Sequence, residues 1–119
     1  MNLELHIREL EEKVKHLEER IEMLASIADF EKHPFIFTAL EYGLSRDDVK
    51  KIYGLMEFYR KRISDGDTIT HSEFERELYK EIPSLKGNFP FAKSIVMTLN
   101  DEKLYTEVYE ELKKSGMSI

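Results

Sequence analysis

The sequence contains no cysteine, which excludes disulfides, thiolate nucleophiles and cysteine-ligated zinc sites. No apolar run approaches the ~20 residues that span a bilayer, so we expect no membrane-spanning helix. Met1 leads directly into charged sequence rather than into the apolar core of a secretory signal, and we therefore expect a cytoplasmic protein. Positive charge is in the minority, with 18 Lys and Arg against 24 Asp and Glu. The net charge of −6 argues against broad binding to nucleic acids or anionic membranes.

Catalytic and cofactor-binding motifs are also missing. The sequence has no Gly-x-Ser-x-Gly, no phosphate-binding glycine loop and no His-Glu-x-x-His. The histidines, His6, His16, His33 and His71, are scattered rather than placed at the spacing of metal ligands. The many carboxylates follow exposed positions of the predicted helices. We therefore expect no enzymatic activity, no bound metal and no cofactor.

Glycine (5) and proline (3) are scarce in these 119 residues, and neither occurs in residues 1–29. All seven phenylalanines and six tyrosines lie from Phe30 onward. Aromatic side chains bury the most area in a small core, so residues 1–29 are not built like a core. The composition predicts two domains, with residues 1–31 forming an oligomerisation helix and residues 32–119 a small helical bundle.

Residues 3–28 carry an unbroken heptad repeat, in which apolar residues recur at alternating spacings of four and three. This pattern predicts a helix roughly 40 Å long with a narrow apolar stripe, which is typical of a coiled coil. The a positions are Ile7, Val14, Ile21 and Ala28, and the d positions are Leu3, Leu10, Leu17 and Leu24. We expect these residues to form an oligomer interface.

The charges beside this stripe favour a parallel pair. The e positions are Glu4, Glu11 and Glu18, and the g positions are His6, Lys13 and Arg20. In a parallel pair Lys13 faces Glu18 of the second chain, whereas an antiparallel pair sets like charges opposite each other. β-Branched residues at a with leucine at d favour a dimer, although no buried asparagine excludes a trimer. The alternative is a long amphipathic helix that folds back on its own domain.

The rest of the chain predicts five shorter helices. Pro34 suits a first helical turn, and Gly43 suits the left-handed position after a helix. Ser45 with Asp48 forms a capping-box pattern that opens a long helix. The predicted helices cover residues 34–42, 45–64, 70–82 and 90–99 and a last segment with Leu104, Val108 and Leu112. Asn100-Asp101 is the expected turn before the last helix, Gly87 and Pro90 lie in the preceding loop, and Gly66 and Gly116 act as helix stops.

Residues 65–74 resemble the second half of an EF-hand, with Ile69 at the central apolar position and Glu73 as the final ligand. The first ligand position then falls on Arg62, whose charge would repel calcium, and Asp67 replaces the sixth-position glycine. We therefore expect a helix stop, a short extended link and a helix cap rather than a calcium site.

A second motif matches the spacing of a helix-turn-helix, in which a small residue packs between two helices and a glycine makes the turn. The matching residues are Ala39, Gly43, Leu44, Ser45, Val49 and Ile52. Its possible DNA contacts are Arg46, Lys50 and Lys51. Because Asp47 and Asp48 lie where the motif would approach phosphates, we expect no nucleic-acid partner and keep DNA binding as the alternative.

Two stretches, His33-Pro34-Phe35 through Gly43-Leu44-Ser45 to Ile52 and a second near Leu104-Tyr105-Glu107, resemble the YhaI-like family of small helical proteins from bacilli. The resemblance covers roughly residues 30–112. It implies an all-helical, oligomeric, cytoplasmic protein, and it supplies no catalytic residues.

These observations predict a non-enzymatic oligomer that binds another protein as a regulator or adaptor. The alternative is a dimeric helix-turn-helix transcriptional regulator. We expect the protein-binding face to be an aromatic or aliphatic groove on the bundle. Six aromatic residues could contribute to it, although we expect most of them in the core with hydroxyls at its edge: Tyr42, Tyr53, Phe58, Tyr59, Tyr105 and Tyr109.

Overall fold

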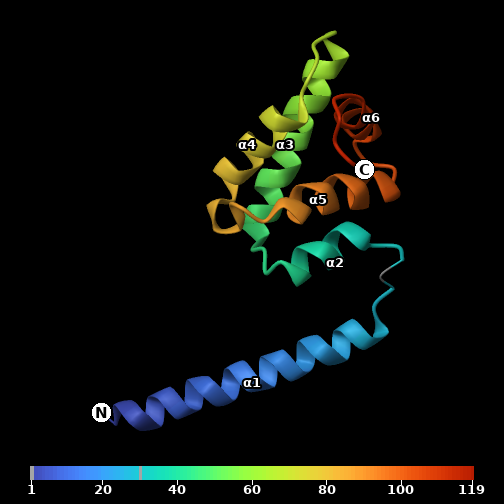
Figure 1. Ribbon diagram of the computed structural model, residues 1–119. Coiled ribbons are helices and arrows are strands. Elements are labelled where there is room, and N and C mark those ends of the chain that lie inside the picture. The colour runs from blue at the N-terminus through green and yellow to red at the C-terminus, as the bar shows by residue number, and fades with distance from the viewer. Residues whose placement is uncertain (1, 30) are drawn as a thin grey trace. The chain divides into compact units, whose positions relative to one another are not determined.

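The computed structural model describes residues 2–29 and 31–119, and every regular element within these ranges is a helix (Figure 1). The first helix, α1, spans Leu3–Ile27. It is followed by α2 (Pro34–Glu41), α3 (Arg46–Ser64), α4 (His71–Glu81), the 3₁₀ turn η1 (Pro83–Leu85), α5 (Phe89–Asp101) and α6 (Thr106–Lys114). The prediction of an all-α fold, with a long first helix and a bundle of five shorter ones, is confirmed.

The contacts between residues divide the chain into two units, Met1–Phe30 and Glu31–Ile119. The composition placed this boundary one residue later, between residues 31 and 32. Within the described residues, no helix combines the length and the apolar character needed to cross a membrane.

The first unit consists of α1 and its caps. The side chain of Asn2 accepts a hydrogen bond from the backbone N–H of Leu5 at 3.1 Å and so caps the first turn. Ala28, the last predicted a position, is the C-cap and has extended backbone, so the helix ends just before the apolar stripe does. No residue within Leu3–Ile27 is buried. A helix gains most of its stability from packing its apolar face, and α1 finds no such packing within its own unit.

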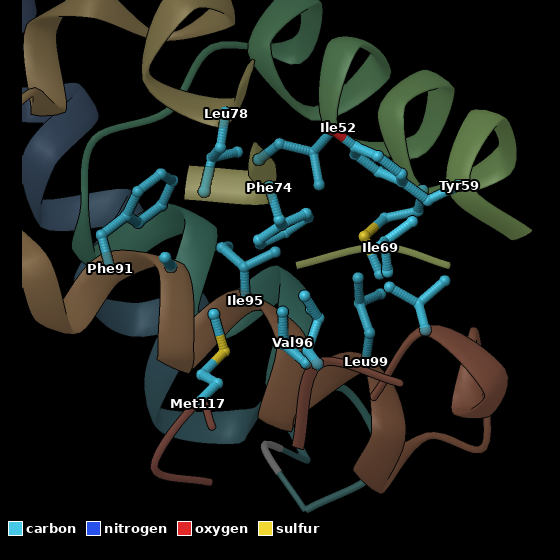
Figure 2. Packing of buried hydrophobic residues seen from close by; sticks show 14 of the residues in the cluster. Ile52, Tyr59, Ile69, Phe74, Leu78, Phe91, Ile95, Val96, Leu99 and Met117 are labelled. Carbon is cyan, nitrogen blue, oxygen red and sulfur yellow. The ribbon is translucent and has the colours of Figure 1, made fainter. Parts of the chain in front are cut away.

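The second unit is organised around α5. This helix packs against α2 and α6, and α3 packs against α4 and α6. Ile52 of α3 and Phe74 and Leu78 of α4 meet the buried side of α5 in the core (Figure 2). The residues that α5 buries are Phe91, Ala92, Ile95, Val96 and Leu99.

Several helices end in the same turn, the Schellman motif, in which a residue with positive φ follows the last helical turn. After α2, Gly43 has a φ of 69°, and the N–H of Leu44 donates to the carbonyl of Ala39 at 3.0 Å. Gly66 and Gly116 hold the equivalent positions after α3 and α6. The predicted helix stops at these glycines are confirmed.

Both ends of α5 differ from the prediction. Pro90, expected in the preceding loop, lies in the first turn of α5. The expected turn at Asn100-Asp101 is wrong, because α5 continues through both residues. Lys103 takes the positive-φ position instead, at 62°, and the N–H of Leu104 donates to the carbonyl of Leu99 at 2.9 Å. Leu104 belongs to this turn and therefore lies outside α6. The sequence did not predict the turn, because a Schellman turn built on lysine lacks the glycine that marks such turns in a sequence.

Two helix starts are capped by residues distant in sequence. The N-cap of α2, His33, makes no side-chain capping bond, and the N–H of Phe35 donates to the Glu102 carboxylate at 3.0 Å. At α4, the N–H of His71 donates to the hydroxyl of Ser115 at 2.9 Å. These bonds satisfy N–H groups that a helix leaves open, and the carboxylate also complements the positive end of the α2 dipole.

Candidate functional site

The predicted oligomer interface is a continuous apolar stripe along α1. Its large side chains range in exposure from 46% at Ile7 to 65% at Leu3 and Leu24. The other exposed members of the stripe are Leu10, Val14, Leu17, Ile21 and Ala28. Removing apolar surface from water is favourable by roughly 25 cal/mol per Å², and contiguous exposed patches of this kind mark interaction sites. The stripe is therefore the first candidate binding surface.

The corner between α2 and α3 has the local geometry predicted for it. Ala39 is buried, and Gly43 makes the turn. The hydroxyl of Ser45 accepts from the N–H of Asp48 at 3.1 Å, and the Asp48 carboxylate accepts from the N–H of Ser45 at 3.0 Å. The predicted capping box is confirmed.

The predicted DNA-contact residues Arg46, Lys50 and Lys51 are exposed at the start of α3. Asp47 is exposed among them, and Asp48 lies in the same first turn. Three cations thus share this surface with two carboxylates. A phosphate approaching the start of α3 would meet both signs of charge, which weakens an electrostatic case for DNA binding.

Most of the six aromatic residues named as candidates belong to the core. Tyr59 is fully buried, and its hydroxyl has no hydrogen-bond partner among the described residues. Burial, followed by the negative charge of Glu73, raises the pKa of Tyr59 above its ordinary value. Phe58 is the exception to the prediction, because 56% of it is exposed. The partly buried members that pack against the core are Tyr42, Tyr53, Tyr105 and Tyr109.

Arg62 connects α3, the following loop and α4. Its Nε donates to Asp67 at 3.0 Å, and Nη2 donates to the backbone carbonyl of Thr68 at 3.0 Å. Its Nη1 donates to the Glu73 carboxylate at 2.5 Å. The guanidinium carbon also lies 5.5 Å from the centroid of the Tyr59 ring. The hydrogen bond and charge of Glu73 raise the pKa of Arg62, which keeps the side chain cationic.

This arrangement explains the partial resemblance to an EF-hand. In that alignment Thr68 is the seventh position, which supplies a backbone carbonyl to calcium, and Glu73 is the twelfth, which supplies a carboxylate. Both groups are hydrogen-bonded to Arg62. Ile69, at the central apolar position, is buried in the core. The guanidinium thus takes two of the ligands that a calcium ion would use.

The bundle also carries an open groove of about 520 Å³ between α4, the loop after η1 and the start of α5. Tyr79 forms part of its wall, and its hydroxyl donates to the carbonyl of Asn88 at 2.5 Å. Phe89 borders the groove with 73% of its surface exposed. The full lining is Ser72, Glu75, Arg76, Tyr79, Lys80, Lys86, Gly87 and Phe89. The lining has three cations and one carboxylate, and Arg76 and Lys80 also lie 3.9 and 3.6 Å from the Glu77 carboxylate outside the lining, which leaves the groove a balance of one positive charge.

Among residues 2–29 and 31–119, no three histidine, aspartate or glutamate side chains come close enough together to hold a metal ion. No protein-family model, curated protein or solved structure matches the chain. The resemblance to the YhaI-like family therefore stays a prediction.

Sequence reasoning missed two parts of these surfaces. The sequence indicated that Arg62 would repel calcium, but it did not indicate that Arg62 donates a hydrogen bond to Glu73, eleven residues later. It also missed the groove beside Phe89, because the lining residues come from α4, from α5 and from the loop between η1 and α5, and so follow no single periodicity. The available signal was Phe89 itself, a large apolar residue in a turn-rich stretch next to Gly87.

We expect Arg62→Ala to destabilise the bundle by about 1–3 kcal/mol, because it leaves the Glu73 carboxylate and the Thr68 carbonyl without their donor. Arg62→Lys keeps the charge but not the planar fork, so its loss should be intermediate. Denaturant unfolding measures both changes, and millimolar calcium should leave the midpoints unmoved.

Arg60→Ala is the matched control. Arg60 forms an exposed ion pair with Glu57 at 2.7 Å, so its loss should change stability by less than about 1 kcal/mol. Equal effects of the Arg60 and Arg62 variants would contradict a special role for Arg62.

Proposed function

We propose that this protein is a non-enzymatic homodimer that pairs through α1 and binds another protein through its bundle, acting as a regulator or adaptor in the cytoplasm. The observation that carries this proposal is the exposed a and d stripe of α1, with Ile7 46% and Leu24 65% accessible. A second copy of α1 is the occupant that fits the stripe, because a heptad seam is complementary to another heptad seam.

The charges that flank the seam support a parallel pair. Lys13 would face Glu18 of the second chain, and His6 would face Glu11. Val14 and Ile21 at a positions, with leucines at d, favour two strands. A trimer would retain the same seam and would be recognised by its mass.

The groove beside Phe89 supports the choice of partner. Its lining carries Arg76, Lys80 and Lys86 against the single carboxylate of Glu75. Phe89 offers an exposed apolar contact next to this charge. The partner that suits both features is an acidic peptide segment with an aliphatic or aromatic anchor, because complementary charge steers association and a buried apolar anchor supplies affinity.

Leu17→Glu should abolish association through α1 and lower the mass of the oligomer, because it places an unpaired charge in the buried seam at a cost of several kcal/mol per chain. Light scattering at tens of micromolar protein measures the mass, and circular dichroism should show that the bundle stays helical. Leu5→Glu is the matched control, since Leu5 is an exposed residue on the outer side of the heptad. A monomeric unmutated protein would end the proposal of self-association.

Disulfide crosslinking can report the orientation of the two α1 helices, because the chain has no cysteine of its own. Leu3→Cys should crosslink on oxidation if α1 pairs in parallel. Efficient crosslinking between a Leu3→Cys chain and a Leu24→Cys chain would indicate an antiparallel pair instead.

Peptides selected from a random display library against the full chain should be rich in Asp and Glu around one large apolar residue. Binding should weaken in the Arg76→Glu plus Lys86→Glu variant, and moderate salt should weaken it too, because the groove charges are exposed. Isothermal titration with a selected peptide measures the affinity. Lys113→Glu plus Lys114→Glu, on α6, is the charge-matched control and should bind normally. Selected peptides without acidic residues would contradict the proposed partner.

A second candidate function is a helix-turn-helix regulator, favoured by the buried Ala39, the Gly43 turn and the exposed cations at the start of α3. We expect no binding to generic duplex DNA in a gel shift at ~0.1 M salt with micromolar protein, where non-specific DNA binders are detectable. A shift that Lys50→Glu plus Lys51→Glu abolishes would promote this second candidate. A pull-down of genomic fragments should accompany the assay to cover a site-specific reader.

A further inference from the structure

The outward side of α3 carries a surface that neither the core nor the proposed groove uses. At 3.6 residues per turn, seven of its residues fall within about 120° of the helix circumference. All seven are exposed, and the opposite side buries Ile52, Met56 and Tyr59. We call this surface the Gly54 face; its residues are Asp47, Lys50, Lys51, Gly54, Glu57, Phe58 and Lys61.

Gly54 lies at the centre of this face and in the interior of a 19-residue helix. A β-carbon added there would meet no atom within 4 Å, and the backbone does not have positive φ. Among the described residues of the second unit, nothing therefore requires glycine at this position, although glycine weakens a helix relative to alanine. A missing side chain on an outer helix surface permits another backbone to approach closely. Phe58, one turn away, adds an exposed aromatic ring.

We propose that a second copy of this chain packs its α3 antiparallel across this face, with the two Gly54 residues at the crossing point. Such a contact has two-fold symmetry, so every residue of the face meets a residue of the same face in the other copy. The contact rests on α3 and α4 alone and does not depend on pairing of α1.

The charges of the face are complementary in this arrangement. Asp47 lies opposite Lys61 of the second copy, since the two positions are equally distant from Gly54. Lys50 lies opposite Glu57 of the second copy. The Glu57 carboxylate is already held in place by Arg60 at 2.7 Å, so it is positioned before the second copy arrives. A parallel arrangement would instead set each charge against its own kind, which selects the antiparallel one.

An aromatic contact completes the pairing. Lys51 lies opposite Phe58 of the second copy, where an ammonium group above a ring is attractive. The groove on this side, of about 390 Å³, has two carboxylates of α4 in its wall that favour an incoming lysine. Its lining residues are Lys51, Gly54, Leu55, Phe58, Glu77 and Glu81.

Disulfide trapping in the full chain tests this contact. In the double variant Asp47→Cys plus Lys61→Cys, the two cysteines of one helix are about 21 Å apart, so any disulfide must join two chains. We expect the double variant to crosslink about tenfold faster than either single variant, because an antiparallel contact keeps identical single cysteines much farther apart than the ~7 Å that a disulfide can bridge. Single variants that crosslink as fast as the double variant would overturn the proposal. Trapping no faster than with Glu110→Cys on α6 would also overturn it and would leave the face to a different partner.

The same trapping in the Leu17→Glu background separates this contact from the pairing of α1. A 47–61 crosslink that persists there supports the α3 contact, whatever the outcome for α1. Without cysteines, Asp47→Lys should weaken the self-association that remains in this background, and addition of Lys61→Asp should restore it. Failure of the restoring substitution would contradict the charge pairing.

Gly54 offers a last and independent readout. Gly54→Ala should raise the thermal midpoint of the protein, since alanine is the better helix former. Introduced with the two cysteines, it should nevertheless slow the 47–61 crosslink several-fold, because the added methyl group separates the backbones. A variant that is more stable and crosslinks equally fast would show that close approach at Gly54 is not needed.

Discussion

Burial of apolar surface around α5 is the interaction on which the bundle depends. Phe91, Ile95 and Leu99 place one side of this helix in the core, and α2 and α6 pack against it. The other connections add to this arrangement: the Glu102 carboxylate caps α2, and Ser115 caps α4. Each of these hydrogen bonds contributes modestly to the stability of the bundle. They form because packing around α5 has already brought their partners together.

The apolar surface of α1 is treated differently. The bundle covers most of its large apolar side chains within one chain, with Phe58 and Phe89 among the exceptions, whereas Leu17 and the rest of the α1 seam stay exposed. A narrow heptad seam fits one helix of the same kind, whereas a core needs broad faces with aromatic residues. The chain therefore divides into a bundle that buries most of its apolar surface in one core and a helix, α1, whose apolar seam is exposed.

Charge is arranged at two scales. Locally, the guanidinium of Arg62 donates hydrogen bonds to Asp67, to the Thr68 carbonyl and to Glu73, and so holds the link between α3 and α4 in place. At the surface, cations and carboxylates alternate along α3 and α1, and it is their order rather than the net charge of −6 that would specify how copies pair.

The sequence by itself determined the helices and most of their ends, because these follow from local chemistry. The heptad repeat, the Ser45 capping box and the stops at Gly43, Gly66 and Gly116 each lie within one or two helical turns. The turn at Lys103 escaped prediction, because its conformation depends on hydrogen bonds rather than on a glycine. Only the tertiary structure decided that Arg62 would bind Glu73, that Phe89 would border a basic groove and that Gly54 would face outward among charges of alternating sign. These features join residues from separate helices or depend on which helical side the core covers, and packing of the whole bundle sets both.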